Sequence, residues 1–127
     1  MRRARRLKRP VRRRTNNKIK LHYIKHKNFV FINFPYNSNG IIVDDEKILI
    51  RTTLYDKNFQ PLEDKTLTLN IKSNFNNYTE TISTNSQGIA KYYFSPPTAA
   101  QDNEYYNITA IYNDTSTTQN LKVLKHL

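Results

Sequence analysis

The 127-residue sequence contains no cysteine and no tryptophan, and it has only two glycines. The absence of cysteine excludes disulfides, thiol catalysis and thiolate metal ligands together. The sequence also lacks a glycine-rich phosphate-binding loop, a nucleophile elbow and a pair of catalytic carboxylates. We therefore predict that the protein is not an enzyme and that it uses no cofactor.

Long hydrophobic segments are missing as well. The longest apolar run, residues 29–34, is interrupted by Asn33. It is shorter than the core of a signal peptide, which needs about 7–15 apolar residues behind a basic start. It is also far shorter than a membrane span of about 20 residues. We expect no export signal and no transmembrane segment, and the localisation stays open.

Acidic residues are absent from the first 27 positions, which hold thirteen of the twenty-one lysines and arginines. Residues 28–127 contain eight bases and ten acids, so the basic character of the chain belongs to its N-terminal part. Like charges repel, and residues 1–18 offer few apolar atoms to bury. We predict that residues 1–18 form a disordered, arginine-rich arm.

This arm is the candidate site for binding anions. Guanidinium groups donate paired hydrogen bonds to phosphates, and neutralising phosphates releases counterions. No aromatic side chain lies among the arginines, so we expect salt-sensitive, non-specific binding of nucleic acid or of an anionic surface. A solvated tail without a partner is the alternative. The candidate residues are Arg2, Arg3, Arg5, Arg6, Lys8, Arg9, Arg12, Arg13 and Arg14.

The rest of the sequence has the pattern of β-strands. Residues 19–40 form a transition segment with one or two extra strands before a turn at residues 35–40. From Ile41 onward apolar residues recur with a period of two, and turn signals follow at intervals of about 8–12 residues. Alternating segments occur at residues 48–55, 67–71, 78–84, 89–94, 106–112 and 121–123. We predict an all-β, antiparallel β-sandwich over residues 41–125, which folds in a chain beginning near Ser38.

Three short motifs follow one another in this region. They are Asp56, Gln60, Pro61 and Leu62, with Phe59 where glycine is usual; Thr84, Gly88 and Ala90; and Tyr106, Ile108, Ala110 and Tyr112. In this order and spacing, residues 41–125 resemble the immunoglobulin-like domains of invasin- and intimin-type bacterial surface proteins and of archaeal adhesin-like proteins. The resemblance implies an immunoglobulin-like sandwich at a cell surface. Its partner would be a protein or carbohydrate ligand, or neighbouring immunoglobulin-like domains.

The motif residues also have physical roles of their own. Gly88 suits a turn that requires a positive φ. Ala90 and Ala110 are small inward positions that let two sheets approach one another. The hydroxyl of Tyr106 is expected to reach a nearby backbone group, as in the tyrosine corner of sandwich domains.

Two groups of side chains have the chemistry of metal ligands. His22 and His26 are spaced for one helix face, but lysines surround them and the segment has a strand pattern. The acidic run 44–46, with Asp102, Glu104 or Asp114, could offer oxygens to calcium, but its spacing matches no known calcium loop. We expect solvated side chains in both groups and no metal site.

Two functions remain open from the sequence. The first is a non-catalytic immunoglobulin-like module, structural or ligand-binding, resembling the repeats of adhesins. The alternative is a nucleic-acid-associated protein, including a capsid-like one, whose arm neutralises phosphates non-specifically. Translocation across a membrane would favour the first, and a salt-dependent complex with nucleic acid would favour the second.

Overall fold

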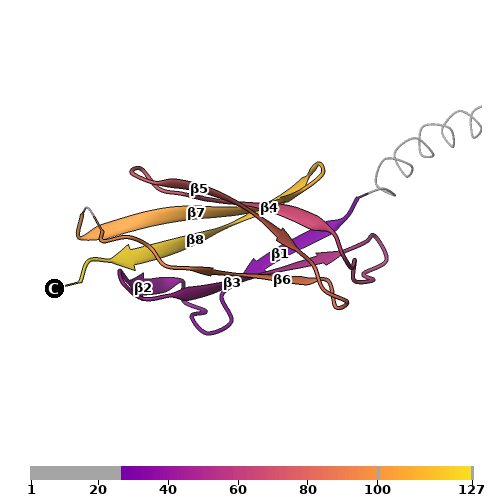
Figure 1. The fold of residues 1–127 in the computed structure, drawn as a ribbon, viewed down its shortest axis with the longest axis horizontal. Coiled ribbons are helices and arrows are strands. Elements are labelled where there is room, and N and C mark those ends of the chain that lie inside the picture. Colours follow the sequence, from indigo (N-terminus) through magenta and orange to yellow (C-terminus); the bar gives the residue numbers. More distant parts are fainter. Residues whose placement is uncertain (1–26, 100, 127) are drawn as a thin grey trace, which may run out of the picture.

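The computed structural model describes residues 27–99 and 101–126, which form an all-β domain (Figure 1). The arm residues and both candidate histidines, His22 and His26, lie outside this part of the chain, as does any strand before residue 27. The strands are β1 (Phe29–Asn33), β2 (Ile41–Val43), β3 (Ile48–Tyr55), β4 (Thr66–Lys72), β5 (Asn77–Ser83), β6 (Ile89–Phe94), β7 (Asn103–Tyr112) and β8 (Thr115–Leu124). Within these residues, no helix is long and apolar enough to cross a membrane.

The strands form two sheets that pack face to face as a sandwich (Figure 1). One sheet has three strands in the order β1-β3-β6, and the other has five in the order β2-β8-β7-β4-β5. The predicted all-β sandwich is thus confirmed. One pair departs from the antiparallel expectation, because β2 lies parallel to β8 in the register Ile41↔Lys122 to Val43↔Leu124.

The turn between β1 and β2 explains the parallel pair. The chain leaves the three-stranded sheet after β1 and enters the five-stranded sheet as β2. Asn37 N donates to Phe34 O, and Gly40 N donates to Asn37 O, so this crossing is tightly hydrogen-bonded. Gly40 has φ +68, and its carbonyl accepts from Lys122 N of β8 at 2.8 Å. The chain therefore enters the second sheet already hydrogen-bonded to the strand beside which β2 lies.

The core lies between the sheets and follows the period of two that the sequence predicts. Inward side chains of the strands are fully buried at the centre of both sheets, among them Ile50, Leu54, Leu67, Leu69, Ile71, Ile108 and Leu121. Ala90 and Ala110 are buried too, which confirms them as small inward positions. Tyr92 and Tyr112 are only partly buried and pack against the edge of the core.

β1 is an extra strand within residues 19–40, as expected, but it belongs to the sandwich, which corrects the predicted boundary at Ile41. It pairs with β3 over five positions, from Phe29↔Tyr55 to Asn33↔Arg51. Val30, Ile32 and Phe34 are each only 6% exposed and join the core cluster. A chain that begins near Ser38 lacks an edge strand and three core side chains, so we now expect it not to fold cooperatively.

The first two motifs tie together the loops β3–β4 and β5–β6. Gly88 has φ +74, as predicted, and its carbonyl accepts from Leu54 N at 2.8 Å. Thr84 Oγ1 donates to Leu62 O at 2.6 Å and accepts from Lys65 N. Asp56 Oδ1 accepts from two backbone amides of its own loop, those of residues 58 and 60. These contacts give the motif residues a structural role.

Tyr106 does not form the predicted bond to a backbone group. Its hydroxyl donates to Glu104 Oε2 and accepts from Asn76 Nδ2, both at 3.2 Å. Glu104 lies two residues earlier on the same inward face of β7, so its carboxylate reaches the hydroxyl directly. Burial raises the pKa of Tyr106 above its ordinary value.

The expectation of a solvated acidic run holds for Asp45 and Glu46, which are exposed, but is wrong for Asp44. Asp44 is only 1% exposed, and its carboxylate accepts from Ala99 N at 2.7 Å and from His126 N at 2.9 Å. These bonds hold together the β2–β3 turn, the β6–β7 connection and the end of the chain. Across residues 27–99 and 101–126, no group of three or more His, Asp or Glu side chains is placed to hold a metal ion.

Candidate binding surface on the three-stranded sheet

The three-stranded sheet presents an outer face made of alternate residues of its strands. Because even-numbered positions of these strands point into the core, the odd-numbered ones point outward. The outward residues are Phe29, Phe31 and Asn33 on β1, Leu49, Arg51, Thr53 and Tyr55 on β3, and Ile89, Lys91 and Tyr93 on β6. Of these, Leu49 is covered and only 6% exposed. Four of these ten positions are aromatic, two are basic and none is acidic. We call this surface the outer face.

Four rings form an aromatic cluster at one end of the outer face: Phe29, Phe31, Tyr55 and Phe59, the last from the β3–β4 loop. Phe29 and Phe59 stack with their ring centres 4.6 Å apart and their planes nearly parallel, at 5°. The ring centre of Tyr55 lies 6.1 Å from that of Phe59 and 6.0 Å from that of Phe31. Phe59 is 59% exposed and Phe31 is 48% exposed. The cluster is therefore a pre-formed apolar surface that solvent still reaches.

The backbone of Phe59 has a conformation that rarely carries a large side chain. Its φ is +61°, in the left-handed region that favours glycine. Such a residue costs on the order of 1–3 kcal/mol, whereas an aromatic pair contributes about 0.5–1.5 kcal/mol beyond its burial. Stacking on Phe29 and the backbone strain are therefore of similar size and opposite sign. Phenylalanine at this position brings little net stability and supplies an exposed ring.

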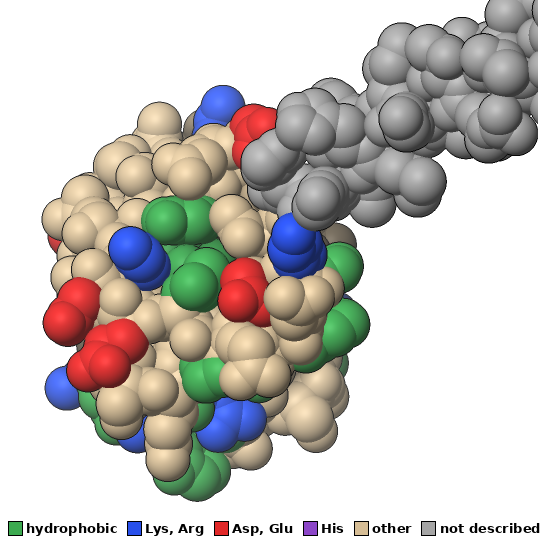
Figure 2. Space-filling model, turned by 90° about the vertical axis from the view of Figure 1, so that its right-hand side faces the viewer, with side chains coloured by type: hydrophobic (Ala, Val, Ile, Leu, Met, Phe, Trp, Pro, Cys, Tyr) green, Lys and Arg blue, Asp and Glu red, His purple; other side chains and the backbone are tan. Residues whose placement is uncertain are grey.

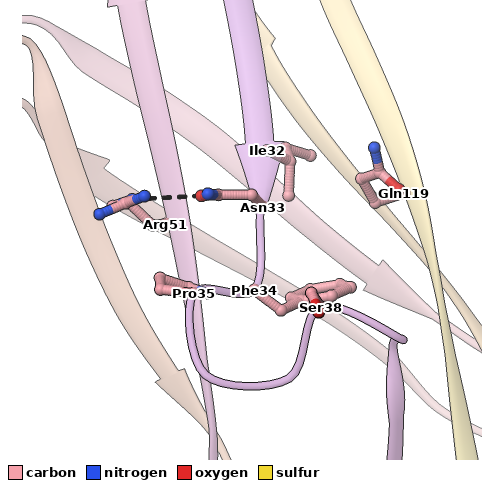
Figure 3. A pocket seen from close by; sticks show the side chains of 7 residues that line it. All are labelled: Ile32, Asn33, Phe34, Pro35, Ser38, Arg51 and Gln119. Carbon is pink, nitrogen blue, oxygen red and sulfur yellow. Dashed lines mark hydrogen bonds between the residues drawn. The ribbon is translucent and has the colours of Figure 1, made fainter.

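The basic part of the outer face lies farther along the same strands. Arg51 Nε donates to Asn33 Oδ1 at 3.2 Å, and Arg51 is the cross-strand partner of Lys91. Arg51 and Asn33 also line a pocket of about 300 Å³, shown in Figure 3. Its lining comes from β1, the turn after it, β3 and β8, and consists of Ile32, Asn33, Phe34, Pro35, Ser38, Arg51 and Gln119. The pocket offers hydrogen-bonding groups next to a guanidinium.

Figure 2 views the end of the sandwich at which β1 begins. Hydrophobic side chains are exposed there, with basic and acidic ones around them. Asp56 belongs to the loop that carries Phe59, and its Oδ1 accepts hydrogen bonds from the loop's own amides. The acids near the cluster therefore come from loops, since the outward strand positions contain none.

The opposite sheet presents a different surface. Its outward positions are mainly Thr, Asn and Ser, and neighbouring side chains bond to each other, as Thr109 Oγ1 and Thr118 Oγ1 do at 3.0 Å. Tyr105 is exposed on this sheet, and Phe75 is exposed in the β4–β5 turn. Neither belongs to the stacked cluster on the other side, so they serve as matched controls for it.

The sequence reasoning located the arm but missed the outer face. The arm residues Arg2 to Arg14 lie outside the described residues, so their binding role stays a prediction. The aromatic cluster was missed because Phe29 and Phe59 are thirty residues apart and meet only through the pairing of β1 with β3. Two signals could have found it: the alternation of Phe29 and Phe31 with buried positions, and a phenylalanine where the motif has glycine.

No family model matches the sequence, and no curated protein matches it. Among solved structures, the chain is similar to an engineered protein, with a TM-score of 0.48 and 13% identity over 80% of this chain and 20% of that one. It is also similar to an endo-β-1,4-mannanase from Thermotoga petrophila, with a TM-score of 0.43 and 10% identity over 77% of this chain and 19% of that one. The chain thus spans about a fifth of the length of either protein, and neither likeness bears on its function.

Proposed function

We propose that the chain is a non-catalytic binding module with an immunoglobulin-like fold, similar to the repeats of cell-surface adhesins, and that it binds through the outer face. The observation that carries this proposal is the aromatic cluster, in which Phe59 is held at a positive φ yet remains more than half exposed. An exposed apolar patch on a rigid sheet is typical of an interaction site. Residues that serve stability alone are usually buried instead.

The strand order supports the immunoglobulin-like part of the proposal. β1, β3 and β6 correspond to strands A, B and E of such domains, and β4, β7 and β8 to strands C, F and G. β5 lies beside β4, where variable-type domains have their C′ strand. The crossings between sheets after β3 and after β5 agree with Greek-key connections.

The placement of the two ends supports a role in a chain of domains at a cell surface. β1 begins at one end of the sandwich and β8 finishes at the other, as Figure 1 shows. Neighbouring domains could therefore be joined end to end, which leaves the outer face accessible to a protein or carbohydrate ligand. The hydrogen bond from His126 N to Asp44 Oδ1 holds the segment after β8 on the domain, which suits it to a defined junction.

Binding by paired double variants tests this proposal. We compare the wild type, the outer-face variant Phe31→Ser with Phe59→Gly, and the control variant Phe75→Ser with Tyr105→Ser. Each is applied to an array of immobilised neutral and acidic glycans and to oligonucleotides. Every neutral glycan and single-stranded oligonucleotide that the wild type binds should be weakened in the outer-face variant and retained in the control. A wild type that binds none of these, or an outer-face variant that holds them equally well, would contradict the proposal.

A second candidate function is association with nucleic acid through the basic arm. The specific observation is that the thirteen basic residues of positions 1–27 directly precede β1, whose outward residues begin the aromatic cluster. The test is gel retardation of unrelated DNA and RNA at rising salt, with and without residues 1–18. Loss of duplex retardation on removal of these residues is expected, because the described domain is nearly neutral. Equal retardation by the shortened chain would refute the role of the arm.

A further inference from the structure

We infer that the outer face binds single-stranded nucleic acid, with bases stacked on its exposed rings and phosphates held by Arg51 and Lys91. This inference rests on the proposed function and deepens it, because it names the ligand class of the same surface. A basic arm alone neutralises single and double strands alike. The outer face adds a reason for preferring unpaired bases.

The rings are arranged as a stacking platform. Phe59 lies against Phe29 with one face, and its 59% exposure leaves the other side of the ring to solvent. Phe31 is exposed on β1, opposite Thr53 of β3. Tyr93 is exposed on β6, opposite Leu49, and so lies farther along the face on the other side of β3. Each base has a π-face that can stack on such rings, whereas the bases of a duplex are already stacked and paired. The platform therefore selects for single strands without reading sequence.

The charged side chains of Arg51 and Lys91 lie close enough to Phe31 to contact the phosphates of a strand whose bases stack on the rings. Arg51 is one outward position along β3 from Thr53, the residue opposite Phe31, which is a distance of about 7 Å. Lys91 faces Arg51 from β6. The hydrogen bond from Arg51 Nε to Asn33 orients the guanidinium, and its terminal N–H groups can donate in pairs to one phosphate.

The electrostatics of the whole chain favour nucleic acid over a neutral carbohydrate. Both ligands stack on aromatic rings. Only the phosphates of a nucleic acid carry negative charge that can pair with Arg51 and Lys91, whereas a neutral sugar carries none. The outer face also begins at β1, directly after the 27 residues that contain thirteen bases and no acid. A polyanion that contacts the rings would therefore be attracted by both the face and the sequence before it.

Fluorescence anisotropy of the full-length chain tests the inference. The probes are a labelled oligothymidylate of about 20 nucleotides and a duplex of equal length, since one binding site of this kind covers about 4–16 nucleotides. The wild type should bind the single strand more tightly than the duplex. Phe31→Ser and Phe59→Gly should each weaken single-strand binding at least about fivefold. Duplex binding should change less than about twofold, because phosphate neutralisation does not use the rings.

Two further variants sharpen the result. Phe75→Ser removes an exposed phenylalanine, 52% accessible, from the β4–β5 turn and should leave both affinities unchanged. Arg51→Gln should reduce the slope of log affinity against log salt for the single strand by about 0.7, the amount expected for one phosphate contact. Circular dichroism melts verify that each variant is folded. Because Phe31 and Phe59 point to solvent, both variants should fold.

The outcomes separate this inference from the proposed function. Equal affinity of the wild type for single strand and duplex would overturn the inference, as would undiminished single-strand binding by both phenylalanine variants. If a glycan is bound instead and Phe31→Ser abolishes that binding, the proposed function stands and the inference fails. If no ligand depends on the outer face, both fail. A single-strand preference lost in both variants and kept in Phe75→Ser supports both.

Discussion

A chain that begins at Ser38 lacks β1, and we expect it to lose cooperative folding. β1 supplies Val30 and Ile32 to the core, and Phe34 follows directly after it; each of the three is only 6% exposed. Burial of a side chain of this size contributes about 1.5–3 kcal/mol, so the three together contribute about 4.5–9 kcal/mol. Native domains are stable by only about 5–15 kcal/mol in total. Removing β1 also leaves an edge of β3 without a partner, so the loss approaches the full stability of the domain.

The assay compares two shortened chains, one beginning at Lys27 and the other at Ser38. Both lack the arm, so any difference between them reports on β1 and the turn that follows it. Urea denaturation followed by circular dichroism should give a cooperative transition for the chain from Lys27 and none for the chain from Ser38. Equal transition midpoints for both chains would refute the reasoning, because β1 would then contribute nothing to the core.

Three other changes test the structure at single positions. Gly88→Ala should reduce the free energy of unfolding in urea by about 2–4 kcal/mol, because its φ is positive and a Cβ would lie 2.6 Å from Leu54 O and 3.0 Å from Pro61 Cβ; a loss below about 1 kcal/mol would contradict the geometry. Phe59→Gly should change that free energy by no more than about 1 kcal/mol, since relief of backbone strain and loss of stacking oppose each other; a large destabilisation would assign the ring a structural role. The raised pKa of Tyr106 means that its stabilising effect is full below pH 10.0 and is lost as the pH rises through the higher folded value. Alkaline melts should therefore show a smaller loss of stability for Tyr106→Phe than for the wild type, and parallel losses would contradict the assignment.

Most strands could be predicted from the sequence because apolar and polar side chains alternate along each strand, whichever strand it pairs with. The segments 48–55 and 89–94 coincide with β3 and β6. Gly88 could be assigned a positive φ because a turn between two strands favours it. These features depend on local pattern and on the chemistry of one residue, which a sequence contains.

Features that depend on distant partners could not be predicted. The period of two and the motifs placed the start of the domain at Ile41, whereas β1 completes the three-stranded sheet by pairing with β3. Asp44 was expected in solvent, but it accepts hydrogen bonds from the amides of Ala99 and His126. These residues lie 55 and 82 positions farther along the sequence. The parallel pairing of β2 with β8 likewise joins segments from opposite ends of the domain.

The candidate site could be predicted only in part, for the same reason. The arginines of the arm are visible in sequence, but the outer face arises from three strands and a loop. Phe59 was recognised as a departure from a glycine position, and the structure gives that departure a physical meaning. The ring stacks on Phe29, which sequence reasoning had placed outside the domain.

The central claim is that the outer face is the binding surface, and an NMR titration tests it most directly. Amide resonances of isotopically labelled full-length protein are followed while oligothymidylate of about 20 nucleotides is added at moderate salt. We predict that the largest shifts occur in β1, β3, β6 and the loop of Phe59, with small shifts in β4 and β7. Shifts confined to the five-stranded sheet or to residues 1–26 would contradict the claim.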